Sequence, residues 1–244
     1  MGRKNFNPGT LTAPLPPVMA TVGDMENSNI ITIGWTGILA SDPPRTYISV
    51  RPQRYSHGLL KEGGEFVINL PTVALAKTVD YVGIFTGKKV DKFKECGLTK
   101  VKSEKVAPPT IGECPVALEC RVYEVVSMGT HDVFMADIVG VSCDESIIDE
   151  NGRMQFDKAD LLAYAHGEYF ALGEKVGTFG FSAAKKKAPD KSAAKKSGEQ
   201  KAKPVETALT KTEEKSENKK RPFYLDAPRG KGQKKAKSKG GKRR

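Results

Sequence analysis

Two long stretches of alternating side chains constrain the fold of this chain more than any other feature. Residues 114–129 (CPVALECRVYEVVSMG) and 131–145 (HDVFMADIVGVSCDE) alternate apolar and polar positions. A period of two is typical of β-strands that bury one face. The short connection SMGT between them predicts a β-hairpin. We therefore expect an antiparallel sheet at the centre of the fold.

Further β-prone segments flank this hairpin. The sequence predicts strands at residues 18–22, 28–40, 46–52 and 65–71, and a proline-stopped turn at SDPPR, residues 41–45. It predicts short helices at 54–64, with Ser56 as N-cap and Gly63-Gly64 at the end, and at 72–86, stopped by Gly87. Residues 157–174 suggest a helix or turn followed by a closing segment.

The predicted fold class is therefore mostly β with short helices. Six or more strands, mostly antiparallel, with two or three short helices favour a closed or nearly closed barrel, because long antiparallel strands must pair or bury their edges. There is no βαβ rhythm and no G-x-G-x-x-G motif. A Rossmann nucleotide site is thus not expected.

Charge divides the chain into two parts. Residues 183–244 carry 22 Lys and Arg against 7 Asp and Glu, a net charge of +15, whereas the first 182 residues carry 18 bases and 22 acids, a net charge of −4. The basic part has almost no aliphatic residues, so we expect a disordered tail. Such a tail suits a polyanion such as nucleic acid, through phosphate contacts that weaken with salt. RPFYLDAP, residues 221–228, is an aromatic island within it.

The cysteines, histidines and apolar runs exclude several classes. The four cysteines form no CxxC pair and the three histidines lie far apart, so no metal site is expected. We expect reduced thiols in an intracellular protein. No apolar run approaches the ~20 residues of a transmembrane helix, and the N-terminus has no signal-peptide core. The expected location is the cytoplasm.

One stretch suggests a ligand. In NIITIGWTGILASDPPRTYISVRPQRYS, residues 29–56, Arg51 and Arg54 offer guanidinium groups to a phosphate, and Ser56 adds a hydroxyl near a helix start. Thr32, Trp35 and Thr36, with glycines among them, suit a flat polar ring. Two plainer interpretations stay open, because a lone Trp in a strand is usually core and two arginines near a turn are usually solvated.

These residues, followed by EFVINLP, resemble the flavin reductase-like, flavoredoxin type of FMN-binding split-barrel proteins. The resemblance continues through VDKFKECGLT (90–99), APPTIGECPVALECRV (107–122), GTHDVFMADIVGV (129–141) and YFALGEKVGTFG (169–180). It implies an FMN-binding split β-barrel over residues 15–182, after a lead-in at 1–14 and before the tail at 183–244. It further implies a homodimer, with one non-covalent FMN per subunit near the interface.

The resemblance also implies roles for individual residues. Thr32, Gly34, Trp35 and Thr36 would lie along the isoalloxazine, and Ser49, Val50 and Arg51 would contact the flavin and its ribityl chain. The phosphate would be held by Arg54, Tyr55 and Ser56. Asn69 matches a position near the site, and Lys92 would supply a further charge.

His131 matches a position near the flavin face where a nicotinamide would stack. The family often has Gly-Asp-His there, whereas this chain has Gly129-Thr130-His131, with an acid only at Asp132. A catalytic role and a purely structural one both stay open. His57, beside the phosphate motif, is expected to be an exposed helix residue.

Three functions follow from these observations. The first is an FMN-dependent oxidoreductase that takes hydride from NAD(P)H and passes electrons to free flavin, a metal complex or a partner protein. The second is a flavoredoxin-like FMN electron carrier that exchanges electrons with a redox protein without NAD(P)H. The third is a polyanion-binding protein whose barrel is only a scaffold. The electron donor, the acceptor and the partner of the tail are not determined by the sequence.

Overall fold

The computed structural model describes residues 2–183. Contacts divide the chain into residues 1–175 and residues 176–244. All elements discussed below belong to the first unit. Of the second, a short 3₁₀ turn at Phe181–Ala183 is described. The predicted disordered tail lies outside the described residues, apart from its first position.

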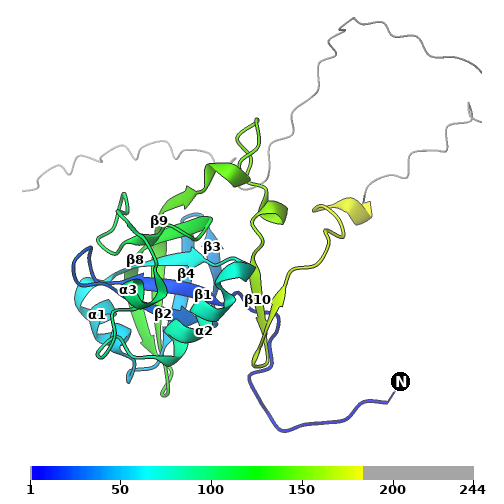
Figure 1. Cartoon of the computed structure of the whole chain (residues 1–244). Helices are drawn as coiled ribbons and strands as arrows, with labels where there is room; N and C mark the ends of the chain where they lie inside the picture. The colour runs from blue at the N-terminus through cyan, green and yellow to red at the C-terminus, as the bar shows by residue number, and fades with distance from the viewer. Residues whose placement is uncertain (1, 184–244) are drawn as a thin grey trace, which may run out of the picture. The chain divides into compact units, whose positions relative to one another are not determined.

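A seven-stranded antiparallel sheet forms the body of the first unit (Figure 1). The strand order is β2-β1-β5-β8-β9-β4-β3. The two longest strands form the predicted hairpin, so this prediction is confirmed. The strands are β1 (Val18–Val22), β2 (Asn29–Ile33), β3 (Thr36–Ser41), β4 (Pro44–Val50), β5 (Glu65–Leu70), β8 (Val116–Ser127) and β9 (Asp132–Cys143).

The two edges of this sheet come together at Gly34 and Trp35. Strands β2 and β3 lie at opposite edges of the sheet, yet only these two residues separate them in the sequence. The backbone N–H of Ser49, in β4, donates a 3.0 Å hydrogen bond to the carbonyl of Trp35. The sheet must therefore curl into a nearly closed barrel. The single strand predicted over residues 28–40 is wrong in this respect, because the chain changes edges in its middle.

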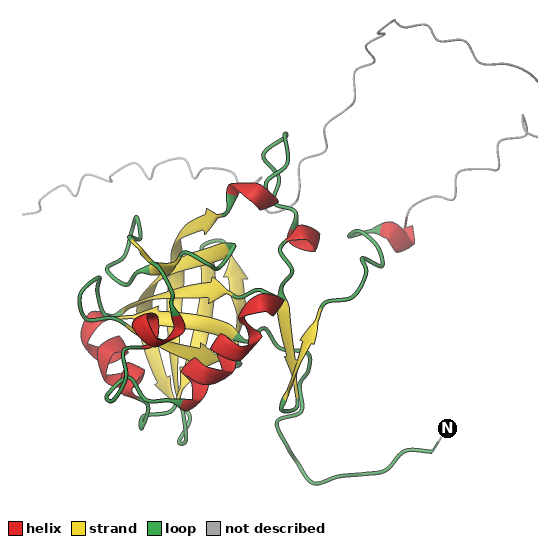
Figure 2. Cartoon of the chain, viewed as in Figure 1, coloured by secondary structure: helices red, strands yellow, loops and turns green. Residues whose placement is uncertain are grey.

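Alternation along β1 shows how the barrel is filled. Val18, Ala20 and Val22 belong to the cluster inside the barrel, which also contains Phe66 and Phe134. Met19 belongs to an outer cluster with residues of α2 (Ala76–Ile84) and α3 (Lys92–Cys96). Helices lie on the outside of the strands in Figure 2. Strand β1 is thus buried on both faces, which explains why all five of its residues are apolar or uncharged.

Helix boundaries differ from the predictions at two places. Helix α1 (Tyr55–Gly63) has Arg54 at its N-cap, so the predicted N-cap Ser56 is wrong: it lies inside the first turn, where its buried hydroxyl accepts a 2.7 Å hydrogen bond from Asn29 Nδ2. Its predicted end is confirmed by Gly64, which adopts the left-handed conformation at φ 64°. Helix α2 ends at Ile84 rather than at Gly87, since Phe85 is already extended.

Short elements complete the unit. Residues 157–174 contain no α-helix, but part of a 3₁₀ turn and then a hairpin of β10 and β11, with Gly167 at φ 95° in its turn. The remaining elements are β6 (Lys100–Val101), β7 (Thr110–Ile111), β10 (Leu162–Ala165), β11 (Glu168–Ala171) and 3₁₀ turns at Val73–Leu75, Glu145–Ile147 and Phe156–Lys158.

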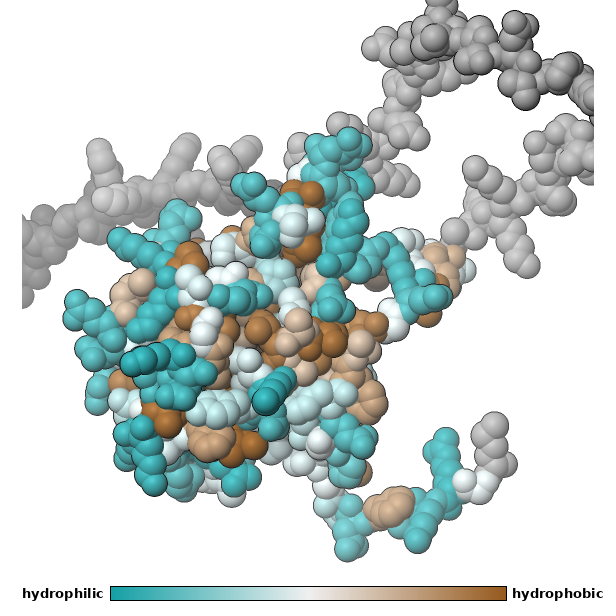
Figure 3. Space-filling view, in the orientation of Figure 1, coloured by the Kyte–Doolittle hydropathy of each residue, from teal (hydrophilic) through white to brown (hydrophobic). Residues whose placement is uncertain are grey.

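The surface carries apolar as well as charged side chains. Figure 3 shows apolar surface near the centre of the face in view, bordered by hydrophilic residues. Ile84 and Phe85, at the end of α2, are 64% and 46% exposed.

Among the described helices, none has the length and apolar character that crossing a membrane would require.

Candidate functional site

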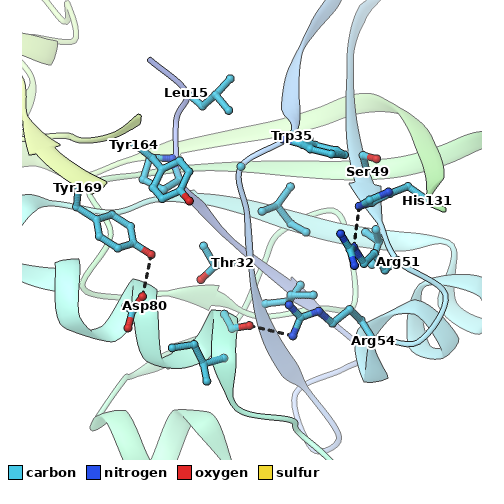
Figure 4. Close-up of a pocket in the computed structure, with 17 residues that line it drawn as sticks. Leu15, Thr32, Trp35, Ser49, Arg51, Arg54, Asp80, His131, Tyr164 and Tyr169 are labelled. Atoms are coloured by element: carbon cyan, nitrogen blue, oxygen red, sulfur yellow. Dashed lines mark hydrogen bonds between the residues drawn. The ribbon is translucent and has the colours of Figure 1, made fainter. Parts of the chain in front are cut away.

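A cleft of about 400 Å³ opens where the two edges of the sheet meet. Its walls come from β2, the Gly34–Trp35 link, the end of β4, α2 and the β10–β11 hairpin (Figure 4). Eight of the predicted site residues line it, namely Thr32, Gly34, Trp35, Ser49, Val50, Arg51, Arg54 and His131. The fold therefore brings together most residues of the stretch that suggested a ligand.

Trp35 forms an aromatic wall of the cleft together with His131. The indole is 39% exposed, so the chain's lone Trp is not a core residue. Its ring centroid lies 4.6 Å from that of His131, at an interplanar angle of 39°. The link between opposite sheet edges holds Trp35 in place, and the turn before β9 holds His131. The two rings offer a surface on which a flat ring can pack.

The hydrogen bonds of His131 define its protonation. Arg51 Nε donates to His131 Nε2 at 3.3 Å, and His131 Nδ1 lies 3.0 Å from Thr130 Oγ1. Because arginine can only donate, Nε2 must accept, which makes the imidazole neutral with its proton on Nδ1. Burial, followed by the nearby Arg51 charge, lowers the pKa of His131 below its ordinary value. The side chain therefore presents a neutral ring to the cleft.

The acid next to His131 has a different partner. Asp132 Oδ2 lies 2.8 Å from Nε2 of His57, and both side chains are buried. The predicted exposure of His57 is therefore wrong. Its imidazole reaches from α1 to the start of β9 and packs edge-on against Phe134, with centroids 5.4 Å apart.

The opposite wall consists of residues that sequence reasoning missed. Tyr164 and Tyr169, from β10 and β11, face Trp35 across the cleft together with Leu15 (Figure 4). Tyr169 Oη donates to Asp80 Oδ1 at 3.3 Å. Burial and then Asp80 raise the pKa of Tyr169 to about 12, so this phenol stays protonated. The aromatic residues of AYAHGEYF were the available signal, but nothing local indicated which surface the hairpin would cover.

A smaller pocket of about 110 Å³ adjoins the cleft and is rich in donors. Arg54 lines both cavities and donates from Nη1 to the carbonyl of Gly83 at 2.9 Å. Within residues 2–183, neither Arg51 nor Arg54 forms an ion pair with a carboxylate. Both guanidinium groups therefore keep donors available for an anion.

Lys92 lines the smaller pocket as well. The side chain is buried, and its Nζ donates to the carbonyls of Ile30 and Val82, both at 2.7 Å. An ammonium group has three donors, so one remains. Burial and then the positive charge of Arg54 lower the pKa of Lys92 to about 8. An anion in the pocket would raise this pKa, because its negative charge favours the protonated ammonium group.

The N-terminus of α1 completes this pocket. Tyr55 and Ser56 line it, and no side chain caps the first turn of the helix. First-turn N–H groups and the positive end of the helix dipole favour an anion. A side chain at Gly87 would place its Cβ 2.8 Å from Tyr55 Cδ1, so the absence of a side chain keeps the pocket open. The donor set suits a phosphate.

Two predicted site residues lie elsewhere. Thr36 donates from Oγ1 to the carbonyl of Tyr47 at 2.6 Å, and it lines neither pocket. Asn69 is fully buried, donates to the carbonyl of Met19 at 3.0 Å and accepts from the N–H of Ile111 at 2.9 Å. Asn69 thus links β5 to its neighbours rather than facing the cleft. Within the described part of the chain, no cluster of three or more His, Cys, Asp or Glu side chains could hold a metal ion.

Comparison with known proteins decides the family. The family model described as a flavin reductase like domain matches residues 11–173. The chain belongs to the flavin reductase-like family. This confirms the resemblance drawn from the sequence, and the split-barrel fold agrees with it.

Individual relatives support the same assignment. This flavin reductase-like chain is 31% identical to the flavoredoxin of Desulfovibrio vulgaris (Miyazaki F), with a TM-score of 0.70 over 75% of this chain and 100% of that one. It is 26% identical to an FMN-binding protein from Thermus thermophilus, with a TM-score of 0.61 over 72% and 99% of the two chains. A protein of Archaeoglobus fulgidus is 39% identical over 121 residues, which are 50% of this chain and 68% of that protein.

Proposed function

We propose that this flavin reductase-like protein is an FMN-dependent oxidoreductase that takes hydride from NAD(P)H and passes electrons to free flavin, a metal complex or a partner protein. The observation that carries the proposal is the position of Arg54, which borders both the aromatic cleft and the donor-rich pocket. A ligand with a flat ring and a phosphate can occupy both cavities at once.

The residues fit FMN in several respects. A cleft of about 400 Å³ lies within the size range of small-molecule sites. Trp35 and Tyr164 supply aromatic walls, and Thr32 and Ser49 bring strand backbone to the cleft. The uncapped start of α1 and the two cations Arg54 and Lys92 suit the phosphate. The relatives named flavoredoxin and FMN-binding protein agree with this choice of cofactor.

When bound, FMN supplies the redox chemistry, because it accepts a hydride and can release electrons singly or in pairs. The chain's own residues bind and orient it. Arg54, Lys92 and α1 hold the phosphate, and the aromatic walls exclude water from the ring. His131 is neutral and lies at the cleft wall, where its imidazole positions Arg51 through their hydrogen bond. We also propose that His131 takes part directly in catalysis by transferring a proton, as the resemblance to the family implies.

The second candidate is an FMN electron carrier that exchanges electrons with a redox protein and does not use NAD(P)H. The similarity to a flavoredoxin, at 31% identity over the whole of that chain, favours this alternative. Both candidates require the same cofactor site. They differ in whether a nicotinamide can reach the ring.

The visible spectrum of the purified protein, followed by cofactor identification after heat release, tests the common requirement. We expect a yellow protein that releases FMN, or apoprotein that takes up FMN at micromolar concentration. A colourless protein that does not bind added FMN at micromolar concentration would overturn the proposal. Steady-state NADH and NADPH oxidation, with and without free FMN, then separates the candidates. No turnover together with rapid reduction by ferredoxin would favour the carrier.

Three further expectations belong to the proposal. A homodimer is supported by β3, which lies at one edge of the sheet with Ile38 and Leu39 exposed.

The net charge of +15 in residues 183–244 supports binding of the tail to nucleic acid or another polyanion. Truncation after Ser182 should abolish salt-sensitive binding to RNA and leave the cofactor in place, whereas salt-sensitive binding by the truncated chain would contradict this role. A cytoplasmic location stays a prediction.

A further inference from the structure

The His57–Asp132 pair is distinguished by its burial. Nε2 of His57 and Oδ2 of Asp132 are 2.8 Å apart, and their side chains are only 9% and 11% exposed. In each Lys or Arg ion pair of the described residues at least one side chain is exposed by more than a third. Neither partner lines the cleft or the donor-rich pocket. The pair therefore acts on the site only through the backbone that it holds.

Asp132 contacts both ends of one short loop. In the sheet, Asp132 stands opposite Val50, the last residue of β4. Through its carboxylate it binds His57, in the first turn of α1. The segment between these two contacts is residues 51–56. It carries Arg51, Arg54, Tyr55 and Ser56, four of the residues assigned to the flavin and its phosphate.

The loop is held by few further hydrogen bonds, two of which come from side chains: Arg51 Nε donates to His131 Nε2 at 3.3 Å and Arg54 Nη1 donates to the carbonyl of Gly83 at 2.9 Å. Its backbone makes two short-range turn bonds, from Arg54 N–H to the carbonyl of Arg51 and from His57 N–H to the carbonyl of Arg54, both at 3.0 Å. Arg51 and Arg54 are exposed, and no side chain caps α1. Two buried side-chain hydrogen bonds join the first turn of α1 to the sheet, those of Ser56 with Asn29 and of His57 with Asp132, and Leu60 packs into the barrel cluster one turn further on.

We propose that His57 and Asp132 are positioning residues that hold the phosphate-binding loop against the sheet, and so set the preference of the site for a phosphorylated flavin over the unphosphorylated one. This inference rests on the proposed FMN site. The pair fixes the phosphate end of the site, where a displaced loop would lose charge-assisted bonds. The ring end is built by the Gly34–Trp35 link, by β10 and β11, and by His131, which precedes Asp132 in the chain. The side-chain hydrogen bond between His57 and Asp132 involves none of these residues.

Removing one partner outright would leave a buried polar group without its bond, which often unfolds a protein. Two conservative variants avoid this outcome. Asp132→Asn keeps the shape and one acceptor but loses the charge, and His57→Gln keeps a donor on a differently shaped side chain. Each should weaken the restraint on the loop while keeping a hydrogen-bonding group opposite the remaining partner.

The test compares dissociation constants of FMN and riboflavin for the apoprotein, measured by quenching of flavin fluorescence. The wild-type protein should prefer FMN. In both variants we expect this preference to fall by about tenfold or more, with riboflavin affinity unchanged. A purely structural role would weaken both flavins together, because riboflavin shares every feature except the phosphate.

Two control variants match the charge change and the loss of stability. Glu62→Gln removes a charge from an exposed position of the same helix and should leave both constants unchanged. Ile68→Val removes a methylene group from the barrel interior and should lower stability without altering the preference. The inference would be overturned if both Asp132→Asn and His57→Gln kept the wild-type preference for FMN over riboflavin. Equal losses of affinity for the two flavins would overturn it as well. A wild-type protein that binds neither flavin would instead overturn the proposed function, and the inference with it.

Discussion

Trp35 and His131 pack ring against ring at a centroid distance of 4.6 Å and an interplanar angle of 39°, although they lie 96 positions apart in the sequence. The contact forms where the link between β2 and β3 passes the start of β9. It places the chain's single indole at the wall of the cleft, partly exposed. This Trp is therefore both a candidate contact for the ring and a natural reporter of the site.

Binding of FMN should quench the fluorescence of Trp35. A flavin ring packed near the indole accepts its excitation energy, so titration of the apoprotein should reduce the emission until one FMN per chain is bound. Heat-denatured protein is the control for the inner-filter effect. FMN uptake seen by absorbance without a change in Trp emission would contradict the position assigned to the ring.

Replacing Arg54 and Ser56 together, as Arg54→Gln with Ser56→Ala, should weaken FMN binding by about 2–3 kcal/mol, because the phosphate loses charge-assisted hydrogen bonds. The dissociation constant, measured by flavin fluorescence, checks this. Lys61→Gln on the same helix is the matched control, since Lys61 is exposed and lines neither cavity of the site. Unchanged FMN retention in the double variant would exclude this phosphate site.

FMN affinity should fall as the pH rises through about 8. Lys92 is charged below its lowered pKa of about 8 and neutral above it, and a phosphate favours the charged form. Binding therefore takes up a proton near this pH, which weakens binding by up to about tenfold for each pH unit above it. The phosphate itself has a second pKa near ~6 and stays dianionic throughout the window from about 7 to 9.

Riboflavin and Lys92→Met are the controls for this pH dependence. Riboflavin has no phosphate, so its affinity should change little over the same window. Lys92→Met removes the titrating group and should flatten the FMN profile, although the carbonyls of Ile30 and Val82 lose a donor. An FMN profile that is equally steep in the variant would assign the titration to another group.

Gly83→Ala should destabilise the protein by about 1–3 kcal/mol. The added Cβ would lie 3.1 Å from Cβ of Thr32, where α2 packs closely on β2 and Thr32 Oγ1 donates to the carbonyl of Val79. Urea unfolding measures the change. Gly58→Ala is the control, because a Cβ on this α1 glycine meets no atom within 4 Å and should stabilise the helix by about 0.5–1 kcal/mol. Equal effects of the two changes would contradict the close packing.

Ile38→Asp should dissociate the proposed homodimer. Ile38 is 68% exposed on the edge strand β3, and a charge buried in an interface without a partner is costly. Light scattering after size-exclusion chromatography should change from dimer to monomer mass. Val176→Asp, another exposed apolar position outside the sheet, should leave the mass unchanged. A monomeric wild-type protein would contradict the dimer itself.

The sequence by itself determined the class of fold and most of one wall of the site. Period-two alternation predicts a strand wherever one face is buried, so the β8–β9 hairpin was predictable from local pattern. The contiguous stretch from Asn29 to Ser56 supplied Thr32, Trp35, Arg51 and Arg54, because consecutive elements of a small barrel stay close in space.

Only the tertiary structure decided which distant residues meet. Tyr164 and Tyr169 complete the cleft from a hairpin more than 100 positions after the first wall, and His57 finds Asp132 75 positions away. Ser56 lies inside the first turn of α1 rather than at its N-cap, and its hydroxyl binds Asn29 of β2. Local periodicity shows which face of an element is buried, but the partner of a polar group depends on how the sheet curls.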